Sequence, residues 1–174
     1  MNKIIAAFMA LLSLLFGLFS FRCTKPWVAP KEMSERGQQL LEEYKEYVTH
    51  GIVFDMDMED VFFVLGPLKG TSETDGSNFV IYQYENIEIW VDPEYGNKIV
   101  TLLVCDGIYL GLTVGKSTKD DADLRFGAQE DDYFFEEPDG FGYSRYKERN
   151  GVDIGIRYQN RIITRISVSA AVAP

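Results

Sequence analysis

The chain has 174 residues, of which 46% are hydrophobic, and its formal net charge is −10. This length accommodates one compact domain or two very small ones, and the hydrophobic content excludes an intrinsically disordered chain. Because an acidic surface repels phosphate backbones and anionic lipids, we expect no nucleic-acid partner, and membrane contact only through the N-terminal segment described next.

The N-terminal segment, residues 1–22, contains an uncharged apolar run from Ile4 to Phe21 between Lys3 and Arg22. Its length lies between that of a secretory signal and that of a minimal membrane-spanning helix. The segment is therefore predicted to be a signal peptide or a membrane anchor. We expect an exported protein of the cell envelope, either periplasmic or membrane-anchored, and an anchored domain that faces the cytoplasm stays an alternative.

Three processing outcomes stay open for the leader: cleavage after Ser20, lipidation of Cys23, or retention as an anchor. Cys23 is a candidate lipidation site, although Arg22 stands where a bacterial lipoprotein prefers a small residue. Cys105 is the last residue of a predicted apolar strand, where a free thiol is expected to behave as a small hydrophobic residue. Two cysteines this far apart give no disulfide framework, so their pairing stays open.

A short tether and an amphipathic helix follow the leader. Residues 23–33 contain Pro26 and Pro30 and are predicted to be extended. Over residues 34–49 apolar side chains recur at helical spacing behind a predicted N-cap at Ser34. This helix therefore has an apolar stripe to bury.

The rest of the chain reads as two copies of one unit, residues 50–106 and residues 107–169, followed by a tail at 170–174. Glu59 to Gly66 corresponds to Asp120 to Gly127, at a period of about 60 residues. Asn97 and the strand after it correspond in the same way to Asn160 and the strand after it. Each copy is expected to contain a short helix followed by three antiparallel strands.

The helix of each copy carries its own capping signals. Asp57 and Thr118 are the predicted N-caps, with Asp60 and Asp121 at the third helical position. Each helix is expected to end at a glycine in a left-handed conformation, Gly66 or Gly127. The strands are expected at residues 78–84, 87–91, 99–105, 142–147, 152–158 and 161–169. The predicted fold is α+β, two tandem helix-plus-sheet repeats that form a two-layer sandwich.

The segment from Gly111 to Asp121, followed by Phe126 and Gly127, resembles the opening of SmpA/OmlA-type domains, small lipoproteins of the outer-membrane assembly machinery. A tandem pair of such units is similar to the β-lactamase-inhibitor-protein architecture. The resemblance covers residues 51–168 and implies two repeats whose sheets join into one curved surface. It says less about function, because related folds serve unrelated functions.

No catalytic motif is present. His50 is the only histidine, and no serine or cysteine stands in a nucleophile motif. The acids at 55, 57, 59 and 60 invite a calcium interpretation, but the glycine and the closing glutamate of an EF-hand loop are missing. We therefore predict no metal site, no cofactor and no enzymatic activity.

Two features are predicted to bind a protein partner. The first is an acidic loop around Tyr133 and Phe134, for which a solvated charge run is the simpler interpretation. The second is a strand that is apolar on both faces and therefore has to be covered on both. The residues assigned to that second face are Tyr82, Tyr84, Trp90, Val100, Leu102 and Val104. Its cover is either the helix at 34–49 or a partner protein.

The sequence thus predicts a non-enzymatic protein of the cell envelope that acts as a protein-binding or scaffold module. The alternative is a secreted or periplasmic inhibitor or immunity-type protein that blocks a target enzyme. An acidic surface suits the alternative as well, because it can mimic the anionic ligand of a basic target.

Overall fold

The computed structural model describes residues 31–68, 70–73, 78–127, 140–147 and 151–170. The predicted leader, the candidate lipidation site Cys23 and the acidic loop with Tyr133 and Phe134 lie outside these residues. Within the described ranges, no helix is long and apolar enough to cross a membrane.

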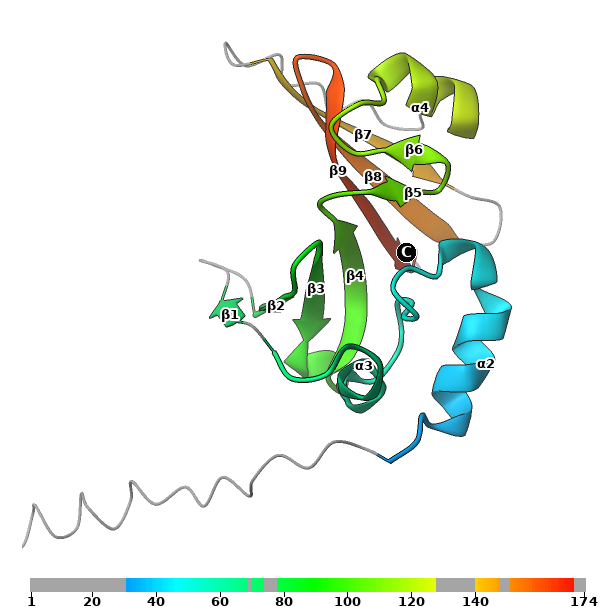
Figure 1. The fold of residues 1–174 in the computed structure, drawn as a ribbon, viewed down its shortest axis with the longest axis vertical. Coiled ribbons are helices and arrows are strands. Elements are labelled where there is room, and N and C mark those ends of the chain that lie inside the picture. Colours follow the sequence, from blue (N-terminus) through cyan, green and yellow to red (C-terminus); the bar gives the residue numbers. More distant parts are fainter. Residues whose placement is uncertain (1–30, 69, 74–77, 128–139, 148–150, 171–174) are drawn as a thin grey trace, which may run out of the picture.

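Seven antiparallel strands form one sheet, in the order β1-β2-β3-β4-β9-β8-β7 (Figure 1). The strands are β1 (Gly70–Glu73), β2 (Val80–Gln83), β3 (Ile87–Asp92), β4 (Lys98–Val104), β7 (Phe141–Lys147), β8 (Val152–Gln159) and β9 (Ile162–Ala170). A separate hairpin of β5 (Ile108–Tyr109) and β6 (Leu112–Thr113) connects the two halves of the chain. The predicted α+β class is confirmed, and the six predicted strands match β2, β3, β4, β7, β8 and β9 within two residues.

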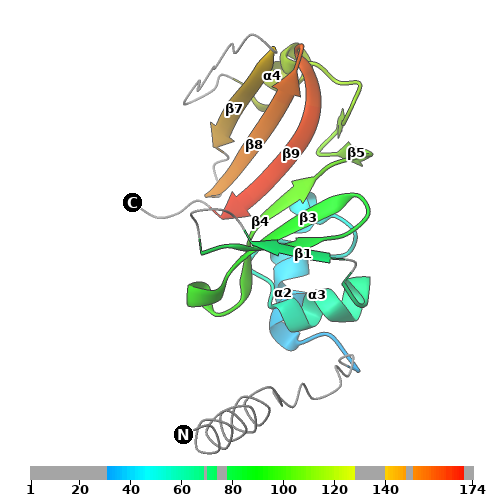
Figure 2. The same ribbon diagram turned by 90° about the vertical axis from the view of Figure 1, so that its left-hand side faces the viewer.

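The three α-helices of the described residues lie on one face of the sheet. They are α2 (Glu35–Glu43), α3 (Met58–Leu65) and α4 (Lys119–Phe126), with short 3₁₀ turns at Lys45–Tyr47 and Pro93–Tyr95. Figure 2 shows the sheet in front with α2 and α3 behind it, so the near face carries no helix of the described residues. This separation defines a helix-covered face and an uncovered face.

The core lies between the helices and the covered face. One row of cross-strand neighbours runs through six strands there: Tyr82, Ile89, Leu102, Val168, Ile154 and Tyr146. The four aliphatic members are fully buried. Removing such side chains from water is the main stabilising term of the fold, at about 25 cal/mol per Å² of apolar surface.

A β-bulge in β4 decides which side chains reach this core. Trp90 pairs with Thr101 and Val91 pairs with Ile99, which leaves Val100 unpaired. The extra residue shifts the alternation of side chains, so residues beyond it occupy the opposite face from the one that strict alternation predicts. Leu102 and Val104 consequently lie with Ile89 and Ile87 on the covered face.

The helix predicted at 34–49 is shorter, because α2 ends at Glu43 and a 3₁₀ turn follows. Its predicted N-cap is confirmed, since the backbone N–H of Gly37 donates to Ser34 Oγ at 2.9 Å. Ser34 in turn donates to the buried carboxylate of Asp60, at 2.7 Å from its backbone N and at 2.6 Å from its hydroxyl. These bonds attach the start of α2 to the start of α3.

The caps of α3 and α4 differ from one another. Asp57 is the N-cap of α3, but its side chain makes no capping hydrogen bond. Thr118 and Asp121 form the predicted capping box of α4. Gly66 and Gly127 end the two helices at φ 75° and 87°, but ψ is −164° and −162°, so the predicted left-handed cap is wrong. This combination of φ and ψ is accessible almost only to glycine.

The capping box makes the stability of α4 dependent on pH. The bond from the Thr118 backbone N–H, and then the bond from its hydroxyl, lower the pKa of Asp121. A lowered folded pKa stabilises the protein above the unfolded value of about 3.9, and this contribution disappears as the pH falls through the folded value. We therefore expect Asp121→Asn to be destabilising at neutral pH and nearly neutral in acid.

Urea unfolding from about pH 6 down to about pH 3 measures the effect. The free energies of unfolding of the wild type and of Asp121→Asn should converge with acid. Thr118→Ala, which removes the hydroxyl of the same box, should cost about 1 kcal/mol at neutral pH. A wild-type advantage that stays constant over the whole range would contradict the assignment.

Candidate functional site

The uncovered face of the sheet is the candidate functional site. Its side chains follow from the strand register, because directly paired residues point to the same side. One row of neighbours is Ile81, Trp90, Thr101, Ser169 and Asp153. The next row is Gln83, Glu88, Leu103, Ser167, Gly155 and Arg145. The face therefore carries apolar side chains at Ile81 and Trp90 of β2 and β3, and charged side chains toward β7.

The apolar end is built around Trp90, which is half-buried and lies beside Ile81 of β2. The ring of Phe79 lies 6.1 Å from the ring of Trp90, between centroids. Tryptophan is enriched at the energetic centres of protein interfaces because it brings a large, rigid surface at little cost in conformational entropy. This end can therefore dock an apolar segment.

Three arginines occupy the other end, on a chain that carries an excess of acids. Arg145 pairs with the buried Asp153, and Arg165 Nη1 lies 3.4 Å from Glu88 Oε2. Arg157 stands directly opposite Arg165 in the strand register. Two of the three guanidinium groups thus have an acidic partner among the described residues.

Tyr143 is held flat over this end of the sheet by the absence of a side chain at Gly155. A Cβ on Gly155 would clash with the hydroxyl of Tyr143 and would lie 2.5 Å from Ser167 Oγ. An aromatic ring packed over a glycine covers the backbone that the glycine leaves bare. Tyr143 is also the direct cross-strand neighbour of Arg157.

The structure separates the interface residues that the sequence assigns to one face. Trp90 lies on the uncovered face, whereas Leu102 and Val104 are buried in the core, so their assignment to the interface is wrong. Val100 is the unpaired residue of the bulge. The helix α2 packs on the covered side through the buried Leu40, and it therefore does not cover Trp90.

The two remaining predicted interface tyrosines contact α3 or its C-cap, on the covered side. The ring of Tyr82 meets Phe62 edge to face at 6.3 Å, and the Tyr84 hydroxyl donates to the carbonyl oxygen of Gly66 at 3.3 Å. Burial raises the pKa of Tyr84. These contacts anchor the helix, so neither tyrosine belongs with Trp90.

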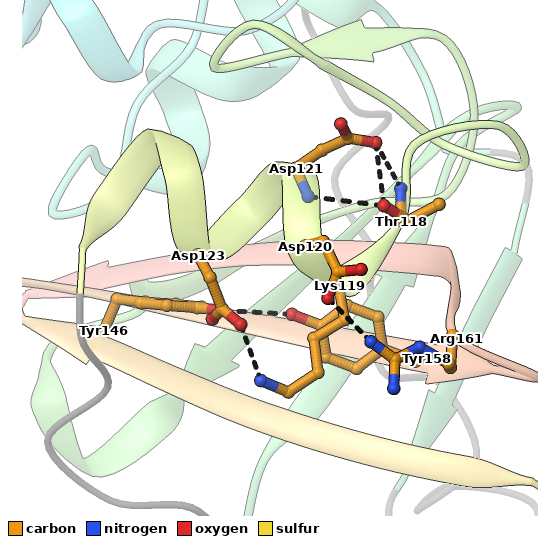
Figure 3. A network of polar contacts seen from close by, with 8 residues as sticks. All are labelled: Thr118, Lys119, Asp120, Asp121, Asp123, Tyr146, Tyr158 and Arg161. Atoms are coloured by element: carbon orange, nitrogen blue, oxygen red, sulfur yellow. Dashed lines mark hydrogen bonds and ion pairs between the residues drawn. The ribbon is translucent and has the colours of Figure 1, made fainter.

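A polar network beneath α4 connects the helix to strands β7 and β8 (Figure 3). The Tyr146 hydroxyl donates to Asp123 Oδ1 at 2.7 Å and lies 3.3 Å from the Tyr158 hydroxyl. Lys119 Nζ donates to Asp123 Oδ2 at 2.8 Å. Burial, followed by the hydrogen bonds to Tyr158 and Asp123, raises the pKa of Tyr146, so its phenol stays protonated. The network holds α4 on the sheet.

We expect Tyr146→Phe to destabilise the protein by about 1–2 kcal/mol, because it removes the donor to a partly buried carboxylate. Tyr143→Phe is the matched control on the uncovered face, since the Tyr143 hydroxyl makes no hydrogen bond with the described residues. It should change the free energy of unfolding by less than about 0.5 kcal/mol. Equal losses in the two variants would contradict an anchoring role for the network.

Two of the four acids considered for calcium, Asp55 and Asp60, have protein partners. Asp55 forms ion pairs with Arg36 at 3.4 Å and with Lys98 at 3.6 Å, and Asp60 accepts from Ser34. The described ranges contain no group of three or more acidic, histidine or cysteine side chains placed to hold a metal ion. His50 is exposed, with Nδ1 2.9 Å from Thr49 Oγ1 in a tight turn.

Cys105 is half-buried, and its thiol forms no disulfide with any of the described residues. Burial raises the pKa of the Cys105 thiol, and the nearby Glu88 raises it further, whereas Arg165 and Arg157 lower it. The thiol thus lies within the field of the uncovered face. The sequence could not place the arginines beside it, because their proximity depends on the pairing of β4 with β9.

The sequence matches no protein-family model, and no curated protein matches it. The fold is similar to the crystal structure of a DUF4309 family protein, YjgB, from Bacillus subtilis subsp. subtilis strain 168, with a TM-score of 0.51. The two chains are 11% identical over 79% of this chain and 99% of that chain. At this identity the likeness concerns the fold alone.

Proposed function

We propose that this protein is a non-enzymatic protein-binding or scaffold module of the cell envelope, and that its partner docks on the uncovered face of the sheet. The observation that carries the proposal is the distribution of the helices, because all three pack on one side (Figure 2). The other side offers Trp90 and Ile81 beside a row of arginines. An apolar centre with a polar rim is the usual composition of a docking surface.

A binding role also accounts for the titratable groups better than catalysis does. Tyr146 and Lys119 both bond Asp123 beneath α4, where they fasten a helix. A catalytic base or nucleophile needs a pKa near the working pH, whereas the shift at Tyr146 is away from it. The three arginines of the uncovered face carry guanidinium groups, which recognise anions and do not exchange protons near neutral pH.

We propose further that the fold consists of two tandem helix-plus-sheet repeats of the SmpA/OmlA type, arranged as in β-lactamase-inhibitor proteins. Equivalent backbone bonds support this: Ile99 N donates to Met56 O, and Ile163 N donates to Ser117 O. The two helices also end at glycines of the same unusual conformation. The pairing of Asp57 with Lys98 and of Thr118 with Ile162 aligns Lys98 with Ile162, one residue from the alignment made by sequence.

The envelope location rests on the leader at residues 1–22, which we propose to be a signal peptide or an anchor, with Cys23 as the lipidation site if a lipoprotein is formed. A tether of about ten residues would then separate the folded part from the membrane. The proposed inhibitor or immunity role uses the same uncovered face. The identity of the partner separates the two roles, a membrane-assembly component or a single soluble enzyme.

Site-specific photo-crosslinking tests the docking face. A photoreactive phenylalanine at Ser169, near the centre of the uncovered face, is compared with one at Gln39, an exposed position on α2. In the native envelope we expect a discrete protein adduct from position 169 and none from position 39. Circular dichroism verifies that both proteins are folded. Adducts from position 39 alone would place the interface on the helices and would refute the proposal.

A further inference from the structure

We infer that Arg157 is the centre of a carboxylate-binding site on the uncovered face, and that its ligand is an acidic side chain of the protein partner. This inference rests on the proposed function and specifies the chemistry of the partner. Three observations support it: the position of Arg157 in the sheet, the absence of an ion pair between Arg157 and any described residue, and the net negative charge of the chain.

The position of Arg157 is fixed by the backbone. Arg157 lies on β8 between Tyr143 of β7 and Arg165 of β9, and all three point to the uncovered face. The register shifts directly after Arg157, where Thr164 is the unpaired residue. The Thr164 hydroxyl donates to the carbonyl oxygen of Arg157 at 3.2 Å. The register shift and this hydrogen bond therefore fix the backbone at Arg157. Its strand, β8, is the central one of the three strands in the second half of the sheet.

Arg157 differs from Arg145 and Arg165 because it forms no ion pair with a described acidic residue. Arg145 has Asp153 and Arg165 has Glu88, whereas Arg157 makes no ion pair with any of the described residues. Like charges directly opposite on neighbouring strands are destabilising. An acidic chain that keeps Arg157 and Arg165 opposite one another tolerates a local repulsion that a bound anion would remove.

The positive charge of Arg157 and Arg165 lowers the pKa values of groups around them. Burial raises the pKa of the Tyr143 phenol, whereas Arg145 and Arg157 lower it. Arg157 and Arg165 act in the same direction on Cys105. A carboxylate matches the planar fork of a guanidinium group and accepts two parallel hydrogen bonds from it.

The charge of the rest of the chain favours a single acidic side chain over a polyanion. A net charge of −10 repels extended anionic surfaces such as nucleic acids and anionic membranes. At physiological salt the Debye length is about 8 Å, so the distant acids are screened while the arginines in contact with the ligand are not. A carboxylate on a protein segment, whose apolar neighbours can contact Trp90, fits both conditions.

The test is a titration with an acetylated and amidated pentapeptide that carries one central aspartate between leucines, at about 150 mM salt, followed by NMR of the Arg157 side-chain Nε–Hε signal. We expect a saturable shift in the wild type and about tenfold weaker binding in Arg157→Gln, judged from the backbone amides of β8 and β9. Arg157→Lys should fall between the two. Arg161→Gln is the matched control, since Arg161 pairs with Asp120 beside α4, and its affinity should equal that of the wild type.

The unfolding temperature of Arg157→Gln distinguishes a loss of binding from a folding defect. Without ligand its unfolding temperature should equal or exceed that of the wild type, because the repulsion with Arg165 is relieved. A lower temperature would show that Arg157 has a structural role and would overturn the inference. The same follows if the peptide causes no shift, or if Arg157→Gln binds it as well as the wild type does.

Two further probes identify the source of the anion. Inorganic phosphate that binds as tightly as the peptide through Arg157 would indicate a free oxoanion and would overturn the assignment of a protein partner. Binding to phosphatidylglycerol vesicles without binding to the peptide would assign the site to a membrane instead. The inference and the proposed function can fail separately. A partner that docks on the uncovered face gives the adduct from position 169 whether or not it carries a carboxylate.

Discussion

Replacing Gly37 by alanine should destabilise the protein by about 2–3 kcal/mol, although alanine in a helix normally stabilises by about 1 kcal/mol relative to glycine. A Cβ at this position would lie 2.5 Å from Asp60 Oδ2 and 2.8 Å from Asp60 Cγ. Asp60 is buried and holds Ser34 through two hydrogen bonds, so it cannot move without losing them. Overpacking of this kind typically costs about 1–3 kcal/mol, to which the lost hydrogen bonds add.

A double-mutant cycle measured by urea unfolding checks the cause. In an Asp60→Ala background the clash is absent, so Gly37→Ala should become neutral or stabilising. Gln39→Ala, an exposed substitution in the same helix, should be neutral or slightly stabilising. If Gly37→Ala stabilises the wild type, then α2 does not dock on α3 through Asp60.

Leu102→Ala should cost about 2–5 kcal/mol, the range for a fully buried leucine. Trp90→Ala should cost only about 1–2 kcal/mol, because Trp90 is half-buried on the face that carries no helix. The order is unexpected from residue size alone, since tryptophan is the larger side chain. It follows from the bulge at Val100, which directs Leu102 into the core.

Thermal and urea unfolding of the two variants measure this order. Val168→Ala, the cross-strand neighbour of Leu102 on β9, should also be strongly destabilising because it lies in the same core row. A larger loss for Trp90→Ala than for Leu102→Ala would mean that a helix covers the face we describe as uncovered. In that case the docking surface would have to be sought elsewhere.

The sequence predicted the strands well because their signals are local. Alternation, tyrosine-rich segments and turn residues such as Asn160 identify β2–β4 and β7–β9 without knowledge of the tertiary fold. The capping box of Thr118 and Asp121 was predictable for the same reason, since both residues belong to one helical turn. The N-cap Ser34 was likewise recognisable from the residues around it.

The candidate site was harder to predict because it depends on pairing. A bulge is defined by two strands, so the sequence of β4 alone does not reveal that Val100 is unpaired. For the same reason the neighbours Arg157 and Arg165 could not be recognised as a pair. The hairpin of β5 and β6 was also missed, since a two-residue strand has no periodicity. It turns at Leu110 and Gly111, both with positive φ.

The most direct test of the docking face is the dissociation constant between the soluble part of the chain and the partner identified by cross-linking. Trp90→Ala should raise it about thirtyfold or more, as expected for a residue at an interface centre. The control is Leu124→Ser, which changes an apolar side chain that is 87% exposed on α4, the highest value for a large apolar residue in the described ranges. It should leave the constant unchanged. Weaker binding by Leu124→Ser, with wild-type binding by Trp90→Ala, would contradict the account and assign the interface to the helices.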